Sequence, residues 1–111
     1  MAITTQDYKH CTVVKMDGRV DSATGDDLYA AFKKVNDQGQ FKLVFDMTEV
    51  DFMSSKGWWV LIETQKACKR YNRGELVLAN VNQKILSSLD LVGMSNYFKV
   101  FDNITDAVGA F

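Results

Sequence analysis

Apolar residues follow two different periods along this 111-residue chain, and each period predicts a type of element. Residues 3–8 alternate weakly and residues 11–16 form a β-branched run. The short Lys9-His10 connection between them indicates a hairpin. From residue 22 to about residue 38 the period becomes helical, so we expect the hairpin to be followed by a helix. The apolar positions of that helix are Leu28, Ala31, Phe32 and Val35.

The rest of the chain alternates short apolar runs with helical patterns. The runs at 41–45 and 75–79 do not alternate, which is typical of strands that are buried on both faces. The remaining expected elements are strands at 41–45, 75–79 and 97–101 and helices at 55–71, 82–91 and 104–111.

Alternation of strands and helices predicts an α/β fold with a largely parallel sheet, and the opening hairpin makes that sheet mixed. We expect a single domain over residues 1–111, with about five strands and about four helices packed against the sheet. The composition fits this expectation, because 47% hydrophobic and 24% charged residues are ordinary for a small globular domain.

Charge and hydropathy exclude several kinds of partner. The formal net charge is -1, so no basic excess points to nucleic acid or to an anionic membrane. No apolar run approaches the ~20 residues of a membrane span. The first residues lack the charged-then-apolar layout of a signal peptide, and we therefore expect a cytoplasmic protein.

The sequence offers little material for catalysis. One histidine, His10, and two distant cysteines, Cys11 and Cys68, do not have the spacing of a zinc site, so we expect buried structural thiols and no metal. Ser54 and Ser55 have no histidine nearby, and the chain has no glycine-rich phosphate loop. We expect a protein that is not an enzyme and that holds no cofactor.

The junction at residues 50–57, Val-Asp-Phe-Met-Ser-Ser-Lys-Gly, joins a predicted strand to a predicted helix. Backbone N–H groups lack partners at a helix start and the macrodipole is positive there. A serine at this place caps the helix, and the same place suits a phosphate. From the residues alone, capping is the simpler role for Ser54 and Ser55.

The junction resembles the phosphorylation site of the STAS family, in particular its stand-alone anti-anti-sigma factors. The family pattern is an aromatic-aliphatic pair, then Asp-Ser-Ser-Gly or Ser-Ser-Ala-Gly, then an apolar helix. Aligned on Phe52-Met53 and Gly57, the hydroxyl that the family phosphorylates falls on Ser55. Three further segments, in the family's order, extend the resemblance over nearly the whole chain: Gly18-Arg19-Val20-Asp21, Asp46 at a strand end, and Leu91-Val92-Gly93-Met94.

This resemblance implies a bacterial regulatory switch. The unmodified protein would bind a GHKL-type anti-sigma serine kinase and free a sigma factor. Phosphorylation of Ser55 would break the complex, and a PP2C-type serine phosphatase would restore it. An alternative is a non-phosphorylated STAS subunit of a transporter or other signalling assembly, and a second is a small enzyme or nucleotide-binding protein.

The sequence departs from the family pattern at Lys56, Trp58 and Trp59. At 100° per residue, Trp59 falls on the polar face of its helix with Glu63, Lys66 and Arg70. Trp58 lies at the edge of that face, so it either joins an apolar patch with Ser55, Trp59 and Ile62 or takes the core place of the family's Leu. The expected core face comprises Val60, Leu61, Thr64, Ala67, Cys68 and Tyr71. The expected partner surface comprises Asp21, Ser54, Ser55, Lys56, Trp59 and Ile62.

Overall fold

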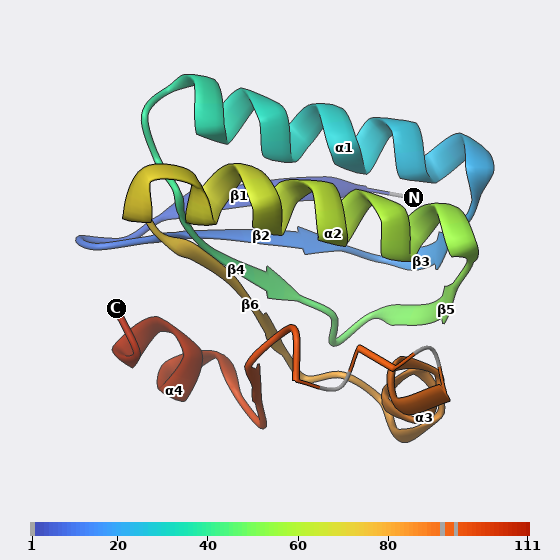
Figure 1. Cartoon of the computed structure of the whole chain (residues 1–111). Coiled ribbons are helices and arrows are strands. Elements are labelled where there is room, and N and C mark those ends of the chain that lie inside the picture. The colour runs from blue at the N-terminus through green and yellow to red at the C-terminus, as the bar shows by residue number, and fades with distance from the viewer. Residues whose placement is uncertain (1, 92, 95) are drawn as a thin grey trace.

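Five strands form one mixed sheet with the order β1-β2-β4-β6-β7 (Figure 1). In the computed structural model, which describes residues 2–91, 93–94 and 96–111, β1 is antiparallel to β2 and the other neighbours are parallel. The strands are β1 Ile3–Asp7, β2 Thr12–Met16, β4 Lys42–Asp46, β6 Glu75–Ala79 and β7 Val100–Phe101. The predicted mixed sheet and its opening hairpin are confirmed.

The described residues form four helices, as expected, and three of them lie on the faces of the five-stranded sheet. In Figure 1, α1 and α2 lie side by side on one face, α4 lies on the opposite face, and α3 sits at one end near β5. The helices are α1 Ser22–Asp37, α2 Ser55–Lys69, α3 Gln83–Leu91 and α4 Ile104–Gly109.

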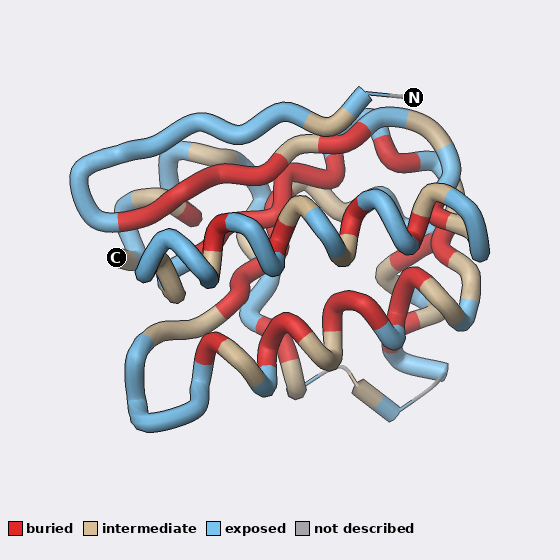
Figure 2. Tube along the Cα trace, turned by 90° about the horizontal axis from the view of Figure 1, so that it is seen from above, coloured by how far each residue is buried: buried red, intermediate tan, exposed pale blue. Residues whose placement is uncertain are grey.

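Two hydrophobic cores, one on each face, explain why the strand sequences do not alternate. Leu43 and Phe45 of β4 belong to the core under α1 and α2, whereas Val44 between them belongs to the core under α4. Because both faces are covered, every position from Leu43 to Met47 is buried, and Figure 2 shows these central strands as continuous buried stretches.

A second, two-stranded parallel sheet was not expected from the sequence. It consists of β3, Gly18–Val20, and β5, Val50–Met53. These strands have only 3 and 4 residues, so neither carries enough positions to produce a periodic signal. Their pairing matters for function, because β3 leads into α1 and β5 leads into α2.

The last strand is shorter than expected: the prediction of a strand at 97–101 is wrong except for Val100 and Phe101. The buried side chain of Gln65 occupies the edge of β6 that this shortening leaves open. Its amide oxygen accepts a hydrogen bond from the Leu76 N–H at 2.7 Å, and its amide nitrogen donates to the Leu76 carbonyl at 3.0 Å. The same nitrogen donates to the Tyr97 carbonyl at 3.2 Å, so one side chain replaces a missing ladder segment.

The second helix also ends earlier than expected. A short 3₁₀ turn, Arg70–Asn72, follows α2, and Tyr71 adopts a positive φ of 58°. Tyr71 is therefore 83% exposed, and its expected place on the core face is wrong. Ala67 is only half-buried, whereas Val60, Leu61, Thr64 and Cys68 are buried as predicted. In the family-like segment at 91–94, Leu91 is exposed, Met94 is half-buried, and Val92 lies outside the described residues.

Candidate functional site

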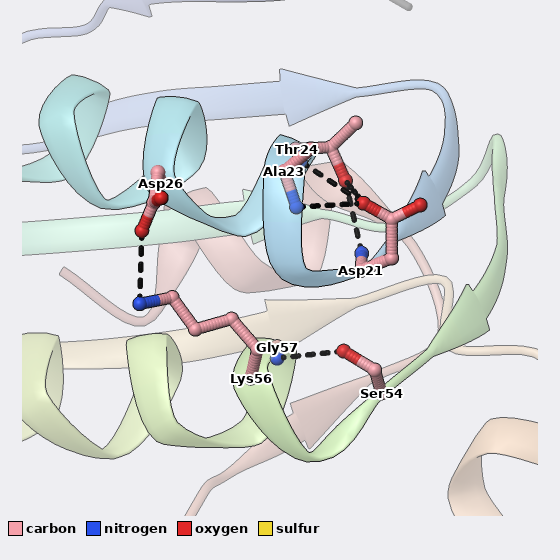
Figure 3. Close-up of polar contacts among 7 residues, drawn as sticks. All are labelled: Asp21, Ala23, Thr24, Asp26, Ser54, Lys56 and Gly57. Carbon is pink, nitrogen blue, oxygen red and sulfur yellow. Dashed lines mark hydrogen bonds and ion pairs between the residues drawn. The ribbon is translucent and has the colours of Figure 1, made fainter.

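The β3–β5 pair places the starts of α1 and α2 next to each other. Val20 at the end of β3 pairs with Met53 at the end of β5, and the Ser54 N–H donates to the Val20 carbonyl at 2.9 Å. Asp21 and Ser54 are the residues that follow these two strands, and Figure 3 shows them at neighbouring helix starts. Tertiary pairing thus brings together residues that lie far apart in the chain.

Asp21 caps α1 through a reciprocal set of hydrogen bonds. Its carboxylate accepts from the backbone N–H groups of Ala23 at 3.1 Å and Thr24 at 3.0 Å, while the Thr24 hydroxyl accepts from the Asp21 N–H at 2.9 Å. This arrangement is a capping box. The hydrogen bonds from Thr24, with smaller effects of Ala23 and Arg19, lower the pKa of Asp21 because they favour the ionised form.

The two serines of the junction have different environments. Ser54 is the N-cap of α2, and its hydroxyl oxygen accepts from the Gly57 N–H at 3.3 Å (Figure 3). Ser55 is the first residue of the helix and is exposed. Within the described part of the chain, the Ser55 hydroxyl takes no part in the cap. The predicted capping role therefore belongs to Ser54, and Ser55 keeps an accessible hydroxyl.

Two glycines allow the close approach that forms this site. A Cβ at Gly57 would lie 2.9 Å from Val20 and Met53 side-chain atoms, so the missing side chain lets α2 start directly against the β3–β5 pair. A Cβ at Gly25 on α1 would lie 2.7 Å from Cγ of Lys56. The aliphatic stem of Lys56 thus crosses α1 at a position where only glycine leaves room for it.

Lys56 connects α2 to α1. Its Nζ lies 2.9 Å from a carboxylate oxygen of Asp26 (Figure 3) and 4.5 Å from the ring centroid of Trp59. The two side chains of the ion pair are 33% and 71% exposed, so the pair contributes only about 0–1 kcal/mol. Because the ion pair is this weak, the ammonium group of Lys56 can readily exchange Asp26 for another anion.

The two tryptophans of α2 point in different directions. Trp58 is 8% exposed and belongs to the main core, in agreement with the core alternative. Trp59 is 44% exposed as predicted, and its ring packs at 5.3 Å against the ring of Tyr29 on α1. Ile62 is half-buried against the core. The other alternative, an apolar patch around Ser55 that includes Trp58, is therefore wrong, because Trp58 is not on the surface.

A mixed aromatic and ionic surface replaces that patch. We call it the α1–α2 surface and define it by Asp26, Tyr29, Lys56 and Trp59, which are joined by the contacts above. Sequence reasoning missed Asp26 and Tyr29. Their spacing of three places both on one face of α1, but no local signal indicates that this face meets α2.

The geometry of the junction suits modification and binding. The accessible Ser55 hydroxyl sits where unpaired N–H groups and the helix dipole favour an anion. The segments that form the site carry charged groups of both signs: Arg19 and Lys56 are cations, and Asp21, Asp26 and Asp51 are anions. A phosphate added here would change the charge of this surface without needing a new fold.

Comparison with known proteins finds a matching domain family and a similar curated protein. The model of the STAS domain family matches residues 2–107. BtrV of Bordetella bronchiseptica, a protein assigned by inference as an anti-sigma factor antagonist, is 26% identical over 111 residues, which cover 100% of this chain and 95% of BtrV.

Solved structures with the same fold share less sequence. An inferred anti-sigma factor antagonist of Thermotoga maritima has a TM-score of 0.90 at 16% identity, covering 97% of this chain and 92% of that one. The anti-sigma factor antagonist SpoIIAA of Bacillus has TM-scores of 0.81 in its unphosphorylated form and 0.77 in its phosphorylated form, at 13% and 14% identity. These comparisons cover 96% and 98% of this chain and 93% and 98% of SpoIIAA. Among the described residues, no helix combines the length and apolar character needed to cross a bilayer.

Proposed function

This chain belongs to the STAS domain family, and from that premise we propose that it acts as an anti-sigma factor antagonist switched by phosphorylation of Ser55. The unmodified protein binds an anti-sigma factor that is also a serine kinase of the GHKL type, and the sigma factor is released. The similarity to BtrV over the whole chain supports the antagonist role. The existence of SpoIIAA in a phosphorylated form supports the type of switch.

The accessible hydroxyl of Ser55 is the observation that carries the assignment of the modified residue. Ser54 is half-buried and its oxygen accepts the Gly57 N–H, so its hydroxyl is already engaged in the cap of α2. Ser55 is exposed at the first position of the same helix. Transfer of the γ-phosphoryl group of ATP to the Ser55 oxygen releases ADP, and a base on the kinase takes the hydroxyl proton. A PP2C-type phosphatase returns the serine by hydrolysis, releasing inorganic phosphate.

Electrostatics explains how one phosphate can disrupt the complex. It brings about -1.5 to -2 charges to a surface that must lose water on binding. That surface comprises Asp21, Ser54, Ser55, Lys56, Trp59 and the accessible part of Ile62, and the neighbouring residues Asp26 and Tyr29 extend it onto α1. The helix itself tolerates the anion, because the charge lies at its positive end. The switch therefore acts on binding and leaves the fold in place.

The decisive experiment incubates the protein with its cognate GHKL-type anti-sigma serine kinase and ATP, and compares two matched variants with wild type. Wild type and Ser54→Ala should each gain one phosphate by intact mass, and peptide mapping should place it on Ser55. Ser55→Ala should bind the kinase and gain no phosphate. Phosphate on Ser54 alone would overturn the assignment. A stable complex with a partner and no phosphate on either serine would favour the non-phosphorylated subunit instead.

A further inference from the structure

The side chain of Lys56 has two partners in the unmodified protein, and both are replaceable. Its ammonium group pairs with Asp26 across the helix interface and lies over the ring of Trp59. The aliphatic stem of Lys56 lies against Gly25 of α1. Lys56 also directly follows Ser55, the exposed first residue of the helix.

We infer that Lys56 is the residue that senses the phosphate on Ser55, and that it does so by leaving Asp26 and Trp59. This inference rests on the proposed modification of Ser55. A phosphate carries about twice the charge of a carboxylate and three acceptor oxygens. It therefore competes with Asp26 for the single ammonium group. In this way phosphorylation of Ser55 on α2 changes the whole α1–α2 surface, including the part that α1 contributes.

The surrounding charges favour this exchange. On α1 the competing anion is Asp26, whose side chain is 71% exposed and is well solvated when it loses its partner. Four further anions, Asp17, Asp21, Glu49 and Asp51, line a hollow beside the β3–β5 pair. Arg19, a cation in the lining of the same hollow, stacks on the ring of Phe52 at 4.1 Å. Lys56 is thus a cation that directly follows Ser55 in the chain and whose ion pair with Asp26 is weak.

The exchange also uncovers an aromatic ring. In the unmodified protein the ammonium group of Lys56 lies 4.5 Å from the Trp59 ring centroid. When it moves to the phosphate, that face of Trp59 loses its cation and becomes more accessible, while the contact with Tyr29 on α1 remains possible. The phosphate therefore alters both the charge and the aromatic part of the same surface.

The first test measures the second pKa of phosphoserine 55 by ³¹P NMR. Phosphoserine is installed at position 55 during translation, so the test does not depend on a kinase, and its failure is distinct from failure of the proposed phosphorylation. Lys56→Gln should weaken the acid, lowering its dissociation constant about twofold to fivefold, because it removes the cation that stabilises the dianion. Asp26→Asn should strengthen the acid, because it frees Lys56 from its competitor.

Matched variants provide the controls for this measurement. Lys66→Gln removes a cation from the same helix that pairs with Glu63, and Asp27→Asn removes an anion adjacent to Asp26. Both should leave the phosphoserine pKa near that of the parent, and Lys56→Arg should preserve it. Equal effects of Lys56→Gln and Lys66→Gln, or of Asp26→Asn and Asp27→Asn, would overturn the inference.

A second readout follows Trp59. In a Trp58→Phe background Trp59 is the single tryptophan, because the chain has two. Phosphoserine at position 55 should increase quenching of its fluorescence by acrylamide, and Lys56→Gln should abolish the difference between the phosphorylated and unmodified proteins. If quenching changes equally with and without Lys56, the lysine does not sense the phosphate.

Discussion

Ser54 and Ser55 are neighbours in the chain, yet their hydroxyl groups have different tasks. Ser54 satisfies the Gly57 N–H at the start of α2, whereas Ser55 is exposed one position later. The two tryptophans that follow divide in the same way, with Trp58 in the core and Trp59 on the surface. At the scale of the residue, the phase of one helix decides which side chain is structural and which one is accessible.

Replacement of the two serines should separate stability from switching. Ser55→Asp should weaken kinase binding and leave the melting temperature nearly unchanged, because a carboxylate in the first turn of a helix is tolerated. Ser54→Ala should lower the free energy of unfolding by about 0.5–2 kcal/mol, because it removes the cap. Urea unfolding and binding titrations measure both effects. An aspartate variant that unfolds, or that binds like wild type, contradicts the proposed switch.

The tryptophans allow a similar comparison. Trp59→Ala should reduce affinity for the partner at least tenfold, since truncating an interface tryptophan can remove ~2 kcal/mol or more of binding free energy. Its effect on stability should be small, because the side chain is 44% exposed and its ring contacts the partly exposed side chains of Tyr29 and Lys56. Trp58→Ala should instead reduce stability by about 3–5 kcal/mol. If Trp59→Ala loses stability and keeps its affinity for the partner, Trp59 does not belong to the interface.

At the scale of the element, α2 does more than cover the sheet. Its first turn carries the junction, its N-terminal half meets α1 through Lys56 and Trp59, and its C-terminal half supplies Gln65 to the edge of β6. Each of these contacts joins α2 to a different segment. A helix of this kind is held by specific polar contacts in addition to its apolar face.

Gln65→Leu tests the polar contact with β6. The change leaves the N–H and carbonyl of Leu76 without partners inside the protein, and each unsatisfied buried group costs about 1–3 kcal/mol. We expect the free energy of unfolding to fall by about 2–4 kcal/mol in urea titrations. Gln83→Leu, at an exposed position of α3, is the control and should change stability by about 0.5 kcal/mol or less. Equal stability of the two variants would show that Gln65 does not support β6.

The cap of α1 should depend on pH. The pKa of Asp21 is lowered in the folded protein, so its contribution to stability is complete above the unfolded pKa of ~3.9 and is lost as the pH falls through the lower, folded value. Asn caps helices about as well as Asp and does not titrate. Asp21→Asn should therefore match wild type at pH 7 and lose less stability between pH 4 and pH 2.

Urea unfolding across this range measures the difference. Asp90→Asn, which changes an exposed carboxylate of α3 outside any described cap, corrects for the loss of one negative charge. If Asp21→Asn and Asp90→Asn have the same pH profile, the lowered pKa of Asp21 does not contribute to stability.

At the scale of the whole molecule, the sheet separates two cores that share its strands. Cys68 lies in the core under α1 and α2, and Cys11 lies in the core under α4; both side chains are fully buried and free. Burial raises the pKa of both thiols, that of Cys68 to about 11. Because the central strands β2, β4 and β6 each contribute side chains to both cores, unfolding of one core should disrupt the other.

Thiol labelling tests this coupling. Neither cysteine should react with an aromatic disulfide reagent at pH 8 in the native protein, since the thiolate is scarce and access is closed. Labelling at increasing urea, read separately for the two cysteines by peptide mass, should give one common midpoint, as expected for cooperative unfolding of a small domain. A lower midpoint for Cys11 would indicate that α4 and its core open independently.

The sequence by itself determined the elements that rest on local periodicity. The hairpin, the four helices and the doubly buried strands all have a period of two, a helical period or an unbroken apolar run within a few residues. It also determined the exposure of Trp59, because the helical phase follows from neighbouring positions alone.

Only the tertiary structure decided the features that depend on distant segments. The β3–β5 pair, the amide of Gln65 at the edge of β6 and the contact of Lys56 with Asp26 each join parts of the chain that no local pattern connects. The exposure of Tyr71 likewise follows from a positive φ, which the helical periodicity of residues 55–71 does not predict. Periodicity reports which side of an element is buried, whereas pairing between elements is settled by packing and by the need to satisfy buried backbone groups.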